Sequence, residues 1–400
     1  MSSLRPVVLF CGALAGDGVA RNTVHLANAL FRRGVPVEIV CLKGGALAAE
    51  LAGPTVTCLG GGRAPRALAL TAAIPALRRR LRETGASVAV SMGNHAHLAL
   101  WAALRGLPDL PRIYRISNDI AHGAAASVRA LGLRLVAADA TRLVCVSRQI
   151  ASADLFRRAR RDRRLDILPN GVDAEAVRAR AATTARHPWI AEGAPYLVAV
   201  GRVHRQKNYE TLIDALAQLR AGAHPDLRLM VLGAASPRRQ AELAARARAQ
   251  GVERAIRFEG EVANPFPLMR QAAAYVLPSR WEGASNSLLE AVACGVPVVA
   301  SRTAGNAADV LADGLYGALA DPDDADDLAA AIALQLDGRT RILPGERAQA
   351  LSLSNVVARL SAIVLSARVK HDGNQMRPES GGHVGPLSAS MRGPKTEYGQ

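Results

Sequence analysis

Aromatic side chains are scarce in this sequence: they make up 4% of its 400 residues, although 50% of the residues are hydrophobic. The core must therefore be built mainly from Ala, Val and Leu, which fits helices packed on sheets. The scarcity also counts against a nucleic-acid-binding protein, because such proteins line their grooves with aromatic or lysine-rich elements. We expect no nucleic acid partner, and a basic nucleic-acid-binding protein is only a remote alternative.

Cysteines are few, odd in number and far apart, and most lie in apolar surroundings, where a buried thiol behaves as a small hydrophobic group. This pattern argues against a disulfide framework and against a cysteine-based metal cluster. It is typical of a protein of the reducing cytoplasm. The five cysteines are Cys11, Cys41, Cys58, Cys145 and Cys294.

Long hydrophobic runs are also missing. No window reaches the roughly 18 uninterrupted apolar residues that a membrane-spanning helix needs. The apolar run at residues 7–10 is shorter than the core of a secretory signal, and it leads into glycines. We therefore expect a cytoplasmic protein that is soluble or binds peripherally at the inner face of the membrane.

Positive charge is abundant, and it is concentrated in the first half. The formal net charge is +16; residues 1–187 carry 27 Lys and Arg against 12 Asp and Glu, whereas residues 188–400 carry 23 against 22. This asymmetry predicts that the first half meets something anionic, such as nucleic acid, an acidic membrane surface or a phosphorylated substrate. The alternative is that the arginine-rich stretches at 78–82 and 157–164 are solvated helix faces.

Short apolar runs alternate with helical periodicity along most of the chain. Residues 6–11 are a predicted strand, a glycine-bearing turn follows, and a helix over 22–33 leads to a second strand at 35–42. Such alternation is typical of a parallel sheet covered by helices on both faces. Further strands in this half are predicted at 87–91, 112–116 and 142–146.

The alternation restarts at Tyr196, after an Arg- and Ala-rich connection. We therefore predict an α/β fold with two Rossmann-like, doubly wound domains that face a cleft, the first over residues 1–187 and the second over 188–345. A last helix at 346–369 could pack back on the N-terminal domain. Residues 370–400 have too few apolar side chains to order themselves, so we expect a disordered tail there.

Two carboxylates eight positions apart mark a loop and helix in the second half. A strand ending at Pro278 is followed by a polar loop with Glu282, and a helix that begins near Asn286 carries Glu290. Ligands of open α/β sheets bind at the carboxyl ends of strands, and a helix N-terminus offers free amides to phosphates or hydroxyls. The pair suits recognition of vicinal diols. The structural alternative is a cap for Glu282 and a surface salt bridge for Glu290.

Arg202 and Lys207 follow the first strand of the second half, on a loop at the carboxyl edge of the predicted sheet. Arginine clamps a diphosphate through its planar guanidinium, and lysine neutralises it as a point charge. Alone, such a pair is common on protein surfaces. Combined with Glu282 and Glu290, it is a specific indication of a ligand-binding site.

The order and spacing of these motifs resemble the family 4 glycosyltransferases, which are retaining enzymes of the GT-B fold with a Glu-x7-Glu signature. The similarity runs well through residues 165–322 and loosely through 6–150. The matching segments are Gly201-Arg202 with Lys207, Leu168-Pro-Asn-Gly-Val-Asp173, Gly260-Glu-Val-Ala-Asn-Pro-Phe266, Ser279-Arg-Trp-Glu-Gly283 and the spacing from Glu282 to Glu290.

The resemblance implies that these residues bind a nucleotide sugar. Arg202 and Lys207 would hold the donor diphosphate and support catalysis, Glu290 would bind the ribose hydroxyls, and Glu282 would bind the sugar hydroxyls near the reacting carbon.

Backbone contacts to the donor would come from several turns. The turn that begins at Gly260 would face the nucleobase with Glu261 and Val262. Glycine allows close backbone approach, so Gly16 and Gly18 could reach the donor phosphates. The remaining predicted donor contacts are Gly201, Gly283, Ala284, Ser285, Asn286 and Ser287.

Two polar segments of the first half resemble the family's acceptor-side loops. One contains Asn94, His95 and His97, and the other contains Asn118 and His122; both follow predicted strands and so point toward the cleft. We expect Asn118 and His122 near the reacting centre. Ordinary turn and cap roles are the alternative.

The resemblance also implies that no metal and no cofactor is needed, since the nucleotide sugar is a substrate. The Asp-x-Asp candidates between Asp321 and Asp327 fit an acidic helix start better. There is one departure from the family, which often has Pro-Glu after the glycines near 305. This chain has Ala304-Gly-Asn-Ala-Ala-Asp309, which leaves open whether Asp309 replaces that glutamate.

We therefore expect a hexosyltransferase-like enzyme that moves a sugar, with retention, from a nucleotide sugar to a hydroxyl of a glycan or lipid-linked acceptor. Cell-envelope polysaccharide, lipopolysaccharide or glycolipid assembly at an anionic membrane surface would suit the basic first half. A nucleotide-sugar epimerase on the same fold is the alternative, although it should lack the combination of Arg202 and Lys207 with the two glutamates. The donor base and sugar, the acceptor, the linkage and the oligomeric state stay open.

Overall fold

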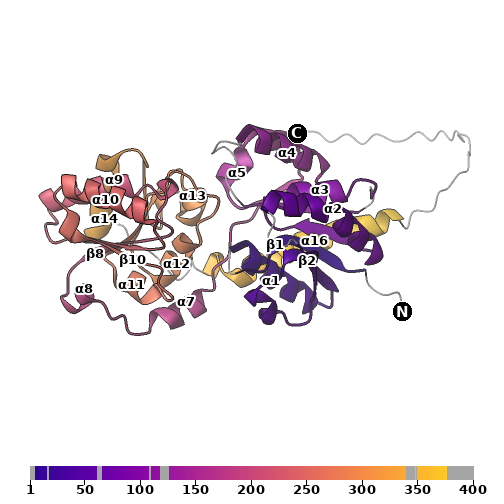
Figure 1. The fold of residues 1–400 in the computed structure, drawn as a ribbon, viewed down its shortest axis with the longest axis horizontal. Helices are drawn as coiled ribbons and strands as arrows, with labels where there is room; N and C mark the ends of the chain where they lie inside the picture. Colours follow the sequence, from indigo (N-terminus) through magenta and orange to yellow (C-terminus); the bar gives the residue numbers. More distant parts are fainter. Residues whose placement is uncertain are drawn as a thin grey trace, which may run out of the picture.

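The structure is a computed structural model in which two α/β lobes lie side by side and one long C-terminal helix runs along the first lobe (Figure 1). Both sheets are entirely parallel, which confirms the predicted fold class. The structure describes residues 5–15, 18–60, 65–107, 110–117, 126–338, 347 and 349–375.

The first lobe is built on a seven-stranded sheet in the order β3-β2-β1-β4-β5-β6-β7. Its central strands are buried on both faces, so they are nearly continuous apolar runs. The strands are β1 (Val7–Ala13), β2 (Val37–Lys43), β3 (Thr55–Cys58), β4 (Val88–Ser91), β5 (Arg112–Ile116), β6 (Arg142–Cys145) and β7 (Leu165–Ile167). The two edge strands, β3 and β7, are short and only half-buried, which explains why the apolar pattern did not reveal them.

Helices cover both faces of this sheet. Helices α2 (Arg66–Glu83), α3 (His97–Ala103) and α4 (Ala126–Asp139) pack on one face, and α1 (Gly18–Phe31) packs on the other. The short helices α5 (Arg148–Ser152) and α6 (Arg157–Arg161) follow β6.

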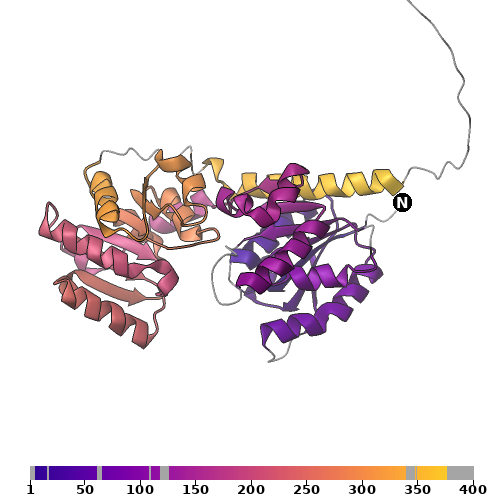
Figure 2. The same cartoon turned by 90° about the horizontal axis from the view of Figure 1, so that it is seen from above.

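The C-terminal helix α16 (Leu353–Gln375) belongs to the first lobe, although it follows the second lobe in sequence. Its Val356, Leu360 and Val364 are buried in the core that α1 shares with the first sheet. Figure 2 shows this helix lying along the whole first lobe. The helix continues past residue 370, where we had predicted the start of a tail; positions 376–400 lie outside the described residues.

The second lobe has a six-stranded sheet in the order β10-β9-β8-β11-β12-β13. Its first strand begins at Tyr196, where the alternation was predicted to restart. The strands are β8 (Tyr196–Val200), β9 (Arg228–Leu232), β10 (Ile256–Gly260), β11 (Ala274–Leu277), β12 (Val298–Ser301) and β13 (Ala318–Ala320).

Two layers of helices enclose the second sheet. Helices α9 (Tyr209–Ala221), α10 (Pro237–Ala249) and α14 (Ala325–Leu336) pack on one face. The acidic run does begin a helix, because Asp324 caps α14 by accepting from the backbone amides of Asp326 and Asp327. The other face is covered by α7 (Ala174–Ala181), α8 (Pro188–Ala191), α11 (Phe266–Gln271), α12 (Asn286–Cys294) and α13 (Ala307–Val310).

No helix in the described ranges is both long enough and apolar enough to cross a bilayer.

Candidate active site

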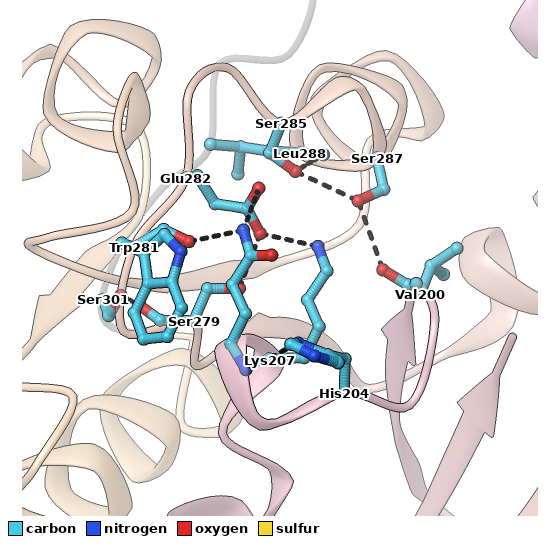
Figure 3. Close-up of polar contacts among 12 residues, drawn as sticks. Val200, His204, Lys207, Ser279, Trp281, Glu282, Ser285, Ser287, Leu288 and Ser301 are labelled. Carbon is cyan, nitrogen blue, oxygen red and sulfur yellow. Dashed lines mark hydrogen bonds and ion pairs between the residues drawn. The ribbon is translucent and has the colours of Figure 1, made fainter. Parts of the chain in front are cut away.

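Lys207 and Glu282 form an ion pair at the carboxyl edge of the second sheet. The Nζ of Lys207 donates to Oε1 of Glu282 at 2.7 Å, and the Oγ of Ser279 donates to the same oxygen at 2.8 Å. Figure 3 shows both groups converging on the carboxylate. The lysine and glutamate side chains are only 16% and 11% exposed. Glu282 is therefore not the cap of α12, which is Ser285 instead.

The turn after β8 brings Lys207 to this position. Gly201 has φ +145°, and a Cβ there would lie 2.7 Å from Cε of Lys207, so only glycine leaves room for the lysine. Asn208, in the left-handed conformation with φ +54°, then starts α9. Arg202 leaves the turn on the exposed side and forms no ion pair or hydrogen bond with the described residues. Its guanidinium is therefore available to a ligand.

The loop before α12 is held from three sides. The backbone amide of Ser285 donates to Oδ1 of Asn306 at 2.9 Å, and the Oγ of Ser287 donates to the carbonyl of Val200 at 3.3 Å. Gly305 packs closely against the loop, since a Cβ there would lie 2.5 Å from the carbonyl oxygens of Glu282 and Gly283. These contacts fix the N-terminus of α12, with Ala284 half-buried beside it.

Glu290 lies in a cavity of about 150 Å³ between the lobes. Gly18 and Arg21 of α1 line this cavity from the first lobe, and Arg180 of α7 lines it from the second. Burial raises the pKa of Glu290, and the positive charges of the two arginines partly offset this effect. Glu290 makes no ion pair within the described parts of the chain, so the surface salt bridge considered above does not form.

The turn after β10 lies beside Arg180. Gly260 has φ +71°, Glu261 is exposed, and Val262 packs partly into the core of the second lobe. The guanidinium of Arg180 donates to the carbonyl of Ala263 at 3.1 Å. Arg180 thus connects this turn to the cavity that contains Glu290.

The first lobe approaches the N-terminus of α12 directly. A Cβ on Gly18 would lie 2.7 Å from Nδ2 of Asn286, so the first residues of α1 and α12 meet across the cleft. Gly16, Asn118 and His122 lie outside the described residues.

A second cavity, of about 370 Å³, lies at the carboxyl ends of the strands of the first sheet. Its polar lining includes Lys43, Asn94, His95 and Ser117, and its other walls are largely apolar. The backbone amide of Ser117 donates to Oδ1 of Asn94 at 2.8 Å, which ties the two predicted acceptor-side segments together. Lys43 was not among the predicted residues, although it follows a predicted strand.

His97 does not belong to this cavity. It is buried, its Nδ1 is hydrogen-bonded to the Oγ of Ser91 at 2.7 Å, and its ring meets Tyr114 edge to face. Burial lowers the pKa of His97 to about 3, so the ring is neutral near pH 7. This histidine is part of the core.

Contacts between side chains of the two lobes could not be foreseen from the sequence. Asp309 accepts a hydrogen bond from the backbone amide of Arg148 at 2.8 Å, so its carboxylate faces the first lobe. Asn170 donates to Asn286 at 2.8 Å. No local pattern marks these pairs, because their partners lie 161 and 116 positions apart in the sequence.

Comparisons with known proteins agree with this architecture. Residues 16–176 match the family described as Glycosyltransferase Family 4, and residues 194–337 match Glycosyl transferases group 1; together the two matches cover more than half of the chain. The Anabaena protein HepE, solved with UDP and glucose, superposes with a TM-score of 0.72 at 19% identity, over 90% of this chain and 100% of that one.

Two curated relatives match over shorter stretches. The glycogen synthase of Mycobacterium tuberculosis strain H37Rv is 35% identical over 43% of this chain, and the D-inositol 3-phosphate glycosyltransferase of Geodermatophilus obscurus is 32% identical over 56%. The matched stretches span 40% and 52% of those two proteins. Since both of its lobes match glycosyltransferase family models, the chain belongs to the family 4, group 1 glycosyltransferases.

Proposed function

We propose that this protein is a retaining glycosyltransferase that moves a sugar from a nucleoside-diphosphate sugar to a hydroxyl group. The observation that carries the proposal is that Lys207, Glu282 and the N-terminus of α12 lie together at the carboxyl edge of the second sheet, while Glu290 of the same helix lines the cavity between the lobes. A family relationship alone would not specify a donor site in this chain, whereas these groups supply cationic, diol-binding and amide contacts together.

The diphosphate would bind to cationic groups of the second lobe. The exposed guanidinium of Arg202 and the ammonium of Lys207 would neutralise charge that develops on the leaving diphosphate, and the free amides at the N-terminus of α12 would add to this. We propose that these groups serve without a metal or a further cofactor.

The two glutamates would hold hydroxyl groups at the two ends of the donor. Glu290, without an ion pair in the described residues, would accept from the ribose diol. Glu282 would accept from the sugar; its Oε1 already accepts two hydrogen bonds, whereas its Oε2 has a single long contact, at 3.4 Å from Gln206. The nucleobase would then lie against Glu261 and Val262.

The acceptor would enter from the first lobe. The cavity lined by Lys43, Asn94 and His95 combines a cation with apolar walls, which suits a glycan or lipid-linked acceptor that carries an anionic group. We propose Asn118 and His122 as further contacts near the reacting centre.

We further propose that the first lobe meets an anionic membrane surface from the cytoplasmic side. Arg79, Arg158 and Arg161 are 74%, 76% and 76% exposed, and Leu131 and Leu135 of α4 are 59% and 43% exposed. Exposed basic groups and exposed leucines on the same lobe suit an interface of anionic lipid headgroups. Sedimentation with phosphatidylglycerol vesicles should show binding that weakens with salt and is absent for phosphatidylcholine vesicles; no binding at low salt would remove this part of the proposal.

Nucleotide binding and sugar release test the main proposal. We expect UDP, GDP or ADP to raise the melting temperature, because a ligand that binds only the folded state stabilises it by mass action. UDP is the first choice, since HepE was solved with it. The corresponding glucose nucleotide should then be slowly hydrolysed, or used for transfer when an acceptor is added. Absence of both binding and turnover across the three bases would reject the proposal, and isomerised sugar nucleotide would indicate an epimerase.

A further inference from the structure

Arg115 is a buried cation that the proposed donor site does not explain. It lies in β5 with 1% of its surface exposed, and it pairs with no carboxylate among the described residues. Burial lowers its pKa to about 10, which leaves the guanidinium protonated near pH 7. An isolated buried charge is costly, so a folded protein retains one only where other groups or a ligand offset it.

The guanidinium begins a chain of hydrogen bonds that crosses between the lobes. Its Nη2 donates to Oδ1 of Asn170 at 2.6 Å, and Nδ2 of Asn170 donates to Oδ1 of Asn286 at 2.8 Å. Asn170 lies on the connection after β7, and Asn286 is the first residue of α12. The chain therefore ends at the helix N-terminus of the donor site.

The guanidinium of Arg115 sets the donor-to-acceptor direction of all the hydrogen bonds in this series. A guanidinium can only donate hydrogen bonds, so the amide oxygen of Asn170 must face it. The NH2 group of Asn170 is then left to donate to the oxygen of Asn286. The NH2 group of Asn286 points toward Gly18, since a Cβ on that glycine would lie 2.7 Å from Nδ2.

We propose that Arg115 is a positioning residue: through Asn170 it turns the NH2 group of Asn286 toward the cleft, where this group joins the helix amides in binding the donor diphosphate. The inference rests on the proposed function. It adds the NH2 group of Asn286 to the groups that bind the nucleotide sugar, and it places the residue that orients this group in the first lobe. Intact contact between the lobes is therefore needed for full affinity for the nucleotide sugar.

Replacing Asn170 by aspartate separates this role from a merely structural one. Aspartate would give Arg115 an ionic partner, and we expect Asn170→Asp to raise the melting temperature. An ionised carboxylate only accepts hydrogen bonds, so Asn286 would have to turn its NH2 group toward residue 170 and its oxygen toward the diphosphate. We therefore expect the same variant to bind nucleoside diphosphate about tenfold or more weakly, a loss of ~1.4 kcal/mol.

Two variants of Arg115 complete the design. Arg115→Lys keeps one donor and should remain within about threefold of wild type in nucleotide affinity. Arg115→Met has a similar length and no donor, and it should bind as weakly as Asn170→Asp. Should Arg115→Met fail to fold, the comparison of Asn170→Asp with Arg115→Lys still decides the question.

Calorimetric titration with UDP, GDP and ADP provides the readout. Wild-type protein that binds none of the three would overturn the proposed function, and this inference with it. Wild-type protein that binds, together with an Asn170→Asp variant of equal affinity, would overturn the inference and leave the proposed function standing. A stabilised Asn170→Asp variant with weakened binding is the result we expect.

Discussion

Arg148 of the first lobe and Asp309 of the second are joined by two hydrogen bonds, one from the backbone amide of Arg148 at 2.8 Å and one from its guanidinium. The side chain of Asp309 is 10% exposed and lies in α13, shortly after Gly305, which packs against the backbone of Glu282. Asp309 thus connects the two lobes.

Removing this bridge should loosen the closed arrangement of the lobes. We expect Asp309→Ala to raise the KM for the donor about three- to fivefold, because the arginine is half-exposed and such pairs are worth about 1 kcal/mol or less. Small-angle scattering should show a larger radius of gyration. Asp313→Ala is the matched control, since this side chain is 65% exposed and, among the described residues, is ion-paired only with the same guanidinium. Equal effects of the two variants would contradict a specific role for Asp309.

Lys207→Ala should abolish most of the transfer activity. The ammonium is the one cation in contact with Glu282 in the described residues, and loss of a preorganised charge at a leaving group lowers rates by about 100-fold or more. Circular dichroism should show an intact fold. Arg205→Ala serves as the control, because Arg205 is an exposed cation on the same short turn. Near-normal turnover by Lys207→Ala would contradict the assignment of the leaving-group site.

Glu290→Gln should change stability and binding in opposite directions. Burial raises the pKa of Glu290, so the folded protein holds this proton more tightly than the unfolded chain does. The contribution of the carboxyl group to stability is therefore fully present below its ordinary pKa of 4.5 and is lost as the pH rises through the folded value.

We accordingly expect Glu290→Gln to melt at a higher temperature than wild type at pH 8, with the difference shrinking as the pH falls toward 4.5. Nucleotide affinity should nevertheless fall, because an amide accepts hydrogen bonds from a ribose diol less well than a carboxylate does. Melting curves and calorimetric titrations across this pH range measure both effects. A difference in melting temperature that grows at low pH would contradict the raised pKa of Glu290.

Gly305→Ala should damage the donor loop. A methyl group at this position would lie 2.5 Å from two backbone oxygens, and the residue has φ +52°. Gly251→Ala measures the cost of the positive φ alone, since Gly251 has φ +71° and open space around it. We expect Gly251→Ala to cost about 1 kcal/mol in unfolding free energy and Gly305→Ala clearly more, with loss of turnover only in the latter. Denaturant unfolding and the transfer assay test this; similar costs in both variants would remove the argument from close packing.

The sequence by itself determined the alternation of strands and helices, and it located the proposed donor-binding residues of the second lobe at strand ends. These features are local, because burial on both faces of a parallel strand and the start of a helix leave a signal within a few residues. Lys207, Glu282 and Glu290 could therefore be found without a structure. The edge strands β3 and β7 were missed because short, half-buried strands leave little of this signal.

Only the tertiary structure decided which groups of the first lobe contact the proposed donor site, and what Asn170 and Arg148 contact. The contacts of Gly18 with Asn286, of Asn170 with Asn286 and of Arg148 with Asp309 depend on how two separately folded sheets are docked. Residues more than a hundred positions apart share no local periodicity, so no pattern in the chain can indicate their pairing. The surroundings of Glu290 are likewise a product of docking, since its raised pKa comes from burial between the lobes.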